Sequence, residues 1–205
     1  APLSVTGVIS GTGGITKIST GVALLSGDNT YTGPTTINAG SLNIAALANG
    51  GNSSPIGASA NTAGNLVLGG GTLVYTGSTV STDRAFTLTS GTNSTINVST
   101  SSTILTIGGA AASSTGSLTK AGNGTLVLSG NNAYTGSTTI SAGTLRLGAT
   151  GTLPNSPLGT NANGTSVTSG AVLDLNGFTL ATAEGLTLNG TGISSSGALI
   201  NSSAT

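Results

Sequence analysis

The sequence contains no cysteine, histidine, methionine or tryptophan, and charged residues make up 4% of its 205 positions. An average soluble protein has about 25% charged residues. Without cysteine the chain forms neither a disulfide nor a thiolate metal site. Four basic residues cannot neutralise a run of phosphates, so nucleic acid is excluded as a partner. The lack of oxidisable side chains is typical of a long-lived extracellular protein.

Long apolar segments are also missing. No run of about 20 apolar residues is present, so we expect no transmembrane helix in this chain. The chain does not begin with a charged segment, an apolar run and a cleavage site, which is the pattern of a secretory signal. We therefore expect a mature or excised part of a secreted protein.

What the chain has instead is glycine, threonine, serine and asparagine, with short apolar pairs spread evenly among them. Such a composition often belongs to disordered chains, which bury too little apolar surface to fold. Here the apolar residues alternate with polar ones, and this period of two places them on one face of a strand. Alternating pairs include Leu66/Leu68, Leu126/Leu128, Leu145/Leu147 and Leu173/Leu175. The pattern predicts an ordered, all-β chain.

A tandem repeat organises the chain. The stretch at 124–148 recurs at 22–44, and Tyr134 and Lys120 each lie 103 positions after Tyr31 and Lys17. We predict one continuous solenoid over residues 1–205, with one unit at about 15–117 and a shorter one at about 118–205. Residues that mark the repeat, and to which we assign structural roles, are Lys17, Tyr31, Gly33, Gly40, Lys120, Tyr134, Gly136 and Gly143.

Short strands at regular intervals fit a sandwich, a barrel or a solenoid. Two tandem β-sandwiches are the alternative prediction, because each unit has about the length of an immunoglobulin-like domain. Sandwich cores need bulky aromatics, however, and the chain has three tyrosines and two phenylalanines in all. Strands of about five residues separated by glycine or asparagine favour a β-helix. At roughly 20 residues per rung the chain would form about ten rungs and a rod of about 50 Å.

The amino-acid sequence of Gly124–Leu147 is specific to a family. The strand GTLVLSG, the turn NNAYTGSTTI and the following AGTL resemble the autotransporter passenger-associated strand repeat, as does the lead-in LTKAGN at 118–123. The first copy departs from it at Ser19 and Pro34. The resemblance implies a right-handed parallel β-helix outside a bacterial cell. It supplies no catalytic residues.

Candidates for chemistry are few. Asp28, Asp83, Asp174 and Glu184 are the only acids, and Asp174 and Glu184 lie far enough apart in sequence to meet on neighbouring rungs. Sugar-cleaving β-helices use such carboxylates. The acid–base pattern is not kept between the copies, since Asp83-Arg84 corresponds to Ala183-Glu184. We therefore predict no enzyme, no cofactor and no metal, and we expect the charges to be solvated or ion-paired at the surface.

Other single features have plain structural explanations. Tyr31 and Tyr134 are either rings that stack on a ligand or rings packed over a glycine corner with the hydroxyl bonded to backbone; we favour the second. Calcium-binding β-roll repeats need an Asp that Gly69-Gly70-Gly71 lacks. Lys17 and Lys120 are candidates for isopeptide crosslinks, but caps of strand ends explain them more simply. Threonine is too scattered for an ice-binding array.

The sequence thus predicts a structural, extracellular solenoid of a bacterial surface protein, acting as a stalk, fibre or sheath. The alternative is an adhesin that binds a surface glycan or protein through the loops at 45–63 and 149–164; ice-binding and carbohydrate-active solenoids rank behind both. Edge strands at either end of a solenoid pair with other chains. We therefore expect end-to-end association or continuation into further repeats.

Overall fold

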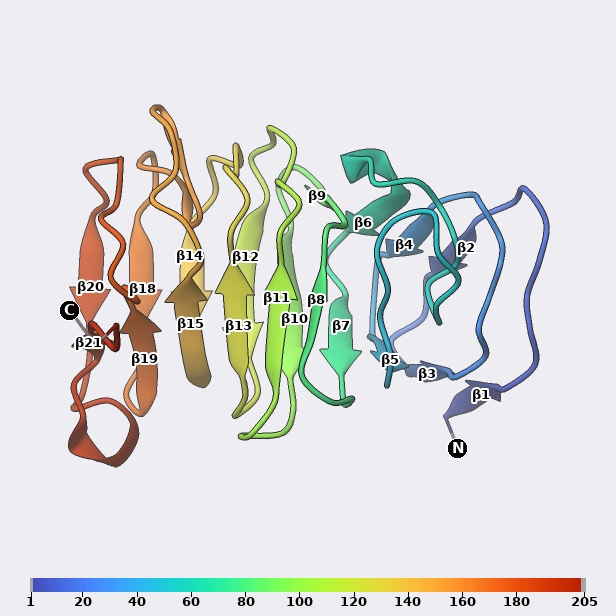
Figure 1. The fold of residues 1–205 in the computed structure, drawn as a ribbon, viewed down its shortest axis with the longest axis horizontal. Coiled ribbons are helices and arrows are strands. Elements are labelled where there is room, and N and C mark those ends of the chain that lie inside the picture. Colours follow the sequence, from blue (N-terminus) through green and yellow to red (C-terminus); the bar gives the residue numbers. More distant parts are fainter. Residues whose placement is uncertain (1, 204–205) are drawn as a thin grey trace.

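The computed structural model describes residues 2–203, and its strands stack side by side along one long axis (Figure 1). The stack forms a parallel β-solenoid of about nine rungs. Every strand pair in its three large sheets is parallel, which excludes the tandem sandwiches. No α-helix occurs among the described residues; two 3₁₀ turns are present, η1 (Ala63–Asn65) and η2 (Ile193–Ser195).

Three sheets form the three faces of the solenoid. The four-stranded face contains β2 (Ile15–Lys17), β4 (Thr35–Ile37), β6 (Leu66–Leu68) and β9 (Thr87–Leu88). The nine-stranded face contains β1 (Leu3–Val5), β3 (Val22–Leu25), β5 (Ser41–Ile44), β7 (Thr72–Tyr75), β10 (Asn93–Val98), β12 (Ser117–Ala121), β14 (Thr138–Ile140), β18 (Thr165–Val167) and β20 (Leu186–Leu188). The six-stranded face contains β8 (Val80–Thr82), β11 (Ile104–Ile107), β13 (Thr125–Leu128), β15 (Gly143–Leu147), β19 (Ala171–Asp174) and β21 (Leu199–Ile200).

Each face buries a column of aliphatic side chains along the solenoid axis. The alternation of the sequence produces this directly, because inward residues of successive rungs are register partners. On the six-stranded face one column reads Leu105, Leu126, Leu145 and Leu173, and it ends at the exposed Leu199 in the last strand. On the nine-stranded face the corresponding column includes Leu73, Ile96, Lys120, Ile140 and Val167, so a lysine occupies an aliphatic position.

The rungs differ in length, and the loops account for the difference. Leu3 pairs with Ala23, 20 positions later, whereas Ser41 pairs with Thr72, 31 positions later. The long rung holds the loop at 45–63, and a second long rung holds the loop at 149–164. This second loop contains the antiparallel pair of β16 (Asn155–Ser156) and β17 (Gly159–Thr160). The two long rungs explain why the chain forms about nine rungs, not ten.

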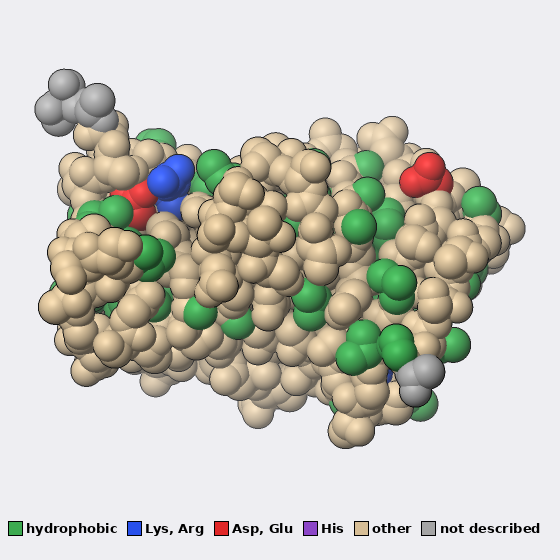
Figure 2. Space-filling view, turned by 90° about the horizontal axis from the view of Figure 1, so that it is seen from below, with side chains coloured by type: hydrophobic (Ala, Val, Ile, Leu, Met, Phe, Trp, Pro, Cys, Tyr) green, Lys and Arg blue, Asp and Glu red, His purple; other side chains and the backbone are tan. Residues whose placement is uncertain are grey.

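The surface carries little charge. Figure 2 shows one side of the molecule, on which charged side chains are confined to a few places among uncharged polar groups and backbone. Part of the charge lies inside. Lys17, Arg84, Lys120 and Asp174 are at most 8% exposed, so the expectation that the charges are all at the surface is wrong for these four residues.

Candidate functional site

The first repeated cluster is a lysine corner. The ammonium of Lys120 donates to the carbonyl oxygens of Ala121 (2.9 Å), Gly122 (2.7 Å) and Ala142 (3.0 Å), the last of which lies on the next rung. Lys17 makes the equivalent contacts with the carbonyls of Ser19 and Ala39. A corner turns strand carbonyls away from the ladder, and the lysine satisfies them.

Burial lowers the pKa of Lys120 to about 8, because the ammonium loses its hydration. Its hydrogen bonds go to carbonyl groups and none goes to a carboxylate. The arrangement therefore joins two rungs at their common corner. It offers no buried acid of the kind that an isopeptide crosslink requires.

Glycines let successive rungs approach closely in both copies. A Cβ on Gly136 would lie 2.2 Å from the carbonyl oxygen of Gly116, and one on Gly33 would lie 2.5 Å from the carbonyl carbon of Gly13. Gly40 and Gly143 have the same positive φ of 64°, which favours glycine, and each faces the carbonyls of the preceding corner. These four positions are thus fixed by stacking.

The tyrosines lie beneath the two loops. The Tyr31 hydroxyl is 2.6 Å from the Thr35 hydroxyl, and the Tyr134 hydroxyl is 2.7 Å from the Thr138 hydroxyl. The predicted backbone partner is therefore wrong: the partner is the threonine at the start of the next strand, whose own hydroxyl donates to a loop carbonyl, that of Ile56 or Leu158. Both rings are at most 1% exposed, which leaves no face for a ligand.

Each ring packs against a glycine, as predicted, and this glycine belongs to the loop above the ring. A Cβ on Gly57 would lie 2.7 Å from the Tyr31 ring, and a Cβ on Gly159 would lie 2.7 Å from the Tyr134 ring. Both glycines have a positive φ, 79° and 98°. The sequence did contain a signal for this contact, since the SPIG and SPLG tetrapeptides at 54–57 and 156–159 are shared by the two loops.

Two asparagines that the sequence analysis did not single out as site residues hold the loops in place. Asn132 accepts a hydrogen bond from the Ala111 amide (2.6 Å) and donates to the Pro157 carbonyl (2.6 Å). Asn29 makes the same pair of contacts with Ile9 (2.7 Å) and Pro55 (2.8 Å). Each side chain thereby ties the preceding rung to the loop.

The two loops differ in the side chain that contacts them from the following rung. Arg84 donates to the carbonyls of Ala48 (2.9 Å) and Gly57 (2.7 Å) and to the Ser59 hydroxyl (3.1 Å). Its guanidinium thus fills the first loop. Burial lowers the pKa of Arg84, and the nearby Tyr31 and Asp83 partly oppose this.

Among residues 2–203, the second loop has no such cationic donor. Glu184, the sequence counterpart of Arg84, accepts from the Thr165 hydroxyl (2.7 Å) and leaves its other oxygen buried without a partner. Burial raises its pKa, while the bond from Thr165 opposes the rise. The Thr182 hydroxyl nearby in sequence is also buried and unpartnered, whereas its counterpart Thr82 donates to the first loop.

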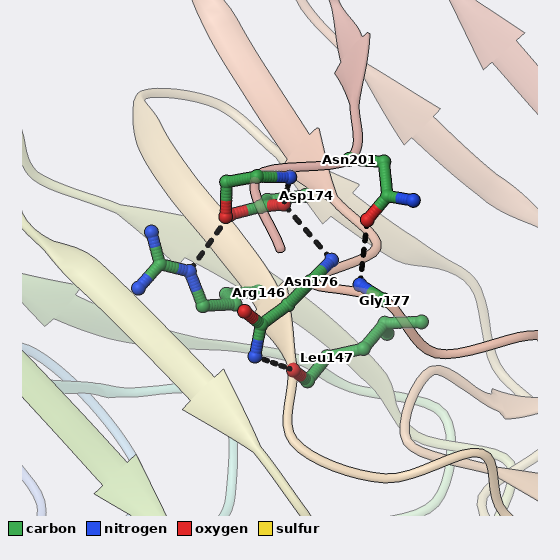
Figure 3. Close-up of polar contacts among 7 residues, drawn as sticks. Arg146, Leu147, Asp174, Asn176, Gly177 and Asn201 are labelled. Carbon is green, nitrogen blue, oxygen red and sulfur yellow. Dashed lines mark hydrogen bonds and ion pairs between the residues drawn. The ribbon is translucent and has the colours of Figure 1, made fainter. Parts of the chain in front are cut away.

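The remaining buried acid forms a separate cluster. Figure 3 shows the Arg146 side chain pointing at the Asp174 carboxylate, with Nε 2.7 Å from Oδ2. The Asn176 amide (2.9 Å) and the Ser202 amide and hydroxyl (3.0 and 2.6 Å) also donate to Asp174. Burial acts to raise the Asp174 pKa, but these donors outweigh it and the pKa is lowered. Asp174 and Glu184 thus have separate partners and show no shared catalytic contact.

The outer surfaces of the two loops carry little charge, and the exposed Asp83 carboxylate accepts a hydrogen bond from the Gly50 amide of the first loop (2.8 Å). Neither 45–63 nor 149–164 contains an acidic or basic residue, and Leu153, at 69% exposed, is the large apolar side chain that the second loop presents. Two surface hollows, of about 490 and 460 Å³, lie along corners of the stack and are lined by small or uncharged residues. Within the described residues no three acids or other metal ligands gather, and no helix is long and apolar enough to cross a membrane.

Comparison with known proteins relates the repeated segments to a described family. Residues 15–44 and 118–147 match the passenger-associated-transport-repeat family. Over 150 residues, or 72% of the chain, the sequence is 46% identical to the Adhesin BmaC autotransporter of Brucella suis biovar 1 (strain 1330). That match spans only 4% of the adhesin's own length. No solved structure matches the chain.

Proposed function

We propose that this chain, which carries two passenger-associated-transport repeats, is a structural length of a bacterial autotransporter passenger that extends from the cell surface. The observation that carries the proposal is the parallel ladder, which joins nine strands on one face without interruption. Stability in such a stack comes from contacts between neighbouring rungs, so length is added by repeating units. The polar clusters support this role, because each ties one rung or loop to the next.

We also propose how far the solenoid extends and how its edge strands associate. Residues 1–205 form one continuous segment of it, and further rungs pair with its edges. Strand β1 has β3 as its partner on one side, and β20 has β18. Both edges expose apolar residues, with Leu3 at 65% and Leu188 at 44% exposed. Rungs of a longer passenger, or the edge of a second copy, would cover them.

Labelling on intact cells tests the location. The chain has no cysteine, so an exposed residue such as Asn52 is replaced by cysteine in the complete passenger. We expect a maleimide that cannot cross membranes to label Asn52→Cys on intact bacteria. Buried Leu126→Cys serves as the matched control and stays unlabelled until the protein is denatured. If Asn52→Cys reacts only after cell lysis, the surface location is refuted.

An adhesive role for the loops is the second candidate. The related Brucella protein is called an adhesin, and both loops present uncharged polar side chains over a rigid base. A binding assay on cultured epithelial cells separates the two functions. Asn161→Ala with Asn163→Ala on the second loop, and Asn49→Ala with Asn52→Ala on the first, should each reduce binding several-fold if the loops bind. Unchanged binding in both variants would leave the stalk as the function.

A further inference from the structure

The sequence repeat and the rungs of the solenoid have different periods. In the first copy, β2 and β4 lie on the four-stranded face and β3 and β5 on the nine-stranded face. In the second copy, the equivalent strands β12 and β14 lie on the nine-stranded face, and β13 and β15 on the six-stranded face. The same two-rung module therefore occupies a different pair of faces in each copy.

The register gives the size of the mismatch. Along the nine-stranded face, successive register partners form a column that runs from Ala23 through Leu42, Leu73 and Ile96 to Lys120. This column climbs four rungs over 97 positions (residue 120 minus residue 23). The sequence repeat is 103 residues long, which is six residues more than these four rungs. Six residues are also the separation of Lys17 in β2 from Ala23 in β3, which is one step around a corner. Each unit thus advances by four rungs and one face.

The module tolerates this change because its lysine contacts are internal, and because Asn29 and Asn132 contact the preceding rung only through backbone amides, those of Ile9 and Ala111. Lys17 reaches Ala39, and Lys120 reaches Ala142, within their own modules. The neighbouring rungs need only supply a parallel ladder and an aliphatic column, which all three faces offer. Lys120, for instance, stacks on Ile96 of the preceding strand β10. Its counterpart Lys17 lies in β2, which is the edge strand of the four-stranded face and has no preceding strand among the described residues.

The loops are consequently presented on different faces. The loop at 45–63 follows β5 and precedes β6, so it occupies the side that β8 and β11 continue as the six-stranded face. The loop at 149–164 follows β15 and precedes β18, and it rests on Tyr134, whose rung neighbour is Ser114. That column continues the four-stranded face, because Phe86 beside β9 pairs with Ala111.

We infer that the two loops are separate interaction surfaces that point away from each other, so that one chain bridges two partners and does not grip one partner with both loops. The partner it fits is a hydrogen-bonding one of low charge, since neither loop contains a charged residue and one acid, Asp83, contacts the first loop. Binding by the loops rests on the adhesive role proposed above. The orientation of the loops does not, and the two are tested separately.

Thiol crosslinking tests the orientation without any ligand. Thr95 and Thr119 are register partners on β10 and β12, and both point outward and are half-buried. Parallel neighbours lie about 4.8 Å apart, so dibromobimane, which fluoresces when it bridges two thiols, should join Thr95→Cys to Thr119→Cys. If a unit were a whole number of rungs, Thr119 would instead follow the column of its counterpart Thr16, which ends at Thr87.

Thr87→Cys with Thr119→Cys is therefore the matched control, and we expect no bridge in it. A bridge in this control, or none in the Thr95/Thr119 pair while circular dichroism shows a folded chain, overturns the inference. Single-cysteine variants at each position establish that the substitutions are tolerated, and spin labels on the same pairs give a second measurement of proximity.

A stoichiometry measurement tests the bridging. Asn52→Cys and Asn161→Cys, one exposed position on each loop, are labelled with biotin on a short linker. Four rungs separate the loops by only roughly 20 Å along the axis, less than the width of streptavidin. Two monovalent streptavidins should bind one chain at once if the loops face apart. A limit of one overturns the inference, whereas failure of the native chain to bind cells would refute only the adhesive role.

Discussion

At the scale of single residues, the buried cations set the shape of the corners and of the first loop. Arg84 and Lys120 both contact backbone carbonyls in place of acids. A cation is suited to this because it donates several hydrogen bonds to oxygens that cannot find one another. Composition pointed to surface charge, since charged residues are almost never fully buried unless they are paired.

Replacing Arg84 should loosen the first loop. Arg84→Ala leaves several buried carbonyls without donors, and we expect it to lower the free energy of unfolding by about 3 kcal/mol. Limited proteolysis should then cleave within 45–63. Arg146→Ala is the control, because Arg146 is partly exposed and Asp174 keeps its donors from Ser202 and Asn176; about 1 kcal/mol is expected. Equal losses in both variants would contradict the assignment.

The tyrosines should make the fold sensitive to strong alkali. Burial raises the pKa of Tyr31, Tyr75 and Tyr134 above 10.0, the ordinary value that applies in the unfolded chain. Their contribution to stability is complete below pH 10 and is lost as the pH rises toward the folded-state values. Phenolate absorbance should therefore appear together with the loss of the far-ultraviolet strand signal. Three tyrosines that titrate near pH 10 in an intact fold would refute this.

At the scale of strands and corners, glycine spacing controls stacking. Gly136→Ala places a Cβ 2.2 Å from the Gly116 carbonyl oxygen, and the rungs must separate to admit it. We expect a cost of about 1–3 kcal/mol, measured by denaturant unfolding. Gly64→Ala is the control, because nothing lies within 4 Å of its Cβ position; it should be neutral. A neutral Gly136→Ala would mean that the corner is less tightly stacked than described.

Much of this level was predictable from sequence. The alternating pairs Leu66/Leu68, Leu126/Leu128 and Leu145/Leu147 lie within β6, β13 and β15. Of the fourth pair, Leu173 lies within β19 and Leu175 directly follows its end. Alternation sets the strands and the inward face. The shared SPIG and SPLG tetrapeptides mark the loop glycines, but the sequence does not show that they contact the tyrosines, because that pairing depends on how the loop folds back. The shift of faces was not predictable either, since rung lengths from 19 to 31 residues depend on those loops.

At the scale of the whole molecule, the exposed edges should promote association. Light scattering should show an apparent mass that rises with concentration, because β1 and β20 each leave one side of a strand unpaired within the described residues. Leu3→Lys with Leu188→Lys should weaken the association at least tenfold, since a charge would have to be buried.

Leu153→Lys is the matched control. It adds the same charge at an exposed leucine that lies on a loop and not on an edge, and it should leave the association unchanged. A wild-type chain that remains a monomer at every concentration would contradict the prediction.

The identical internal contacts of the two modules also bear on how such a chain evolves. Recombination between the gene segments for 15–44 and 118–147 would remove or add 103 residues, and the lysine contacts within the joined module would persist. At the new junction only the strand register has to match, because the module can occupy either pair of faces. Passenger length and the direction in which loops are displayed can therefore change in one genetic event without a new fold.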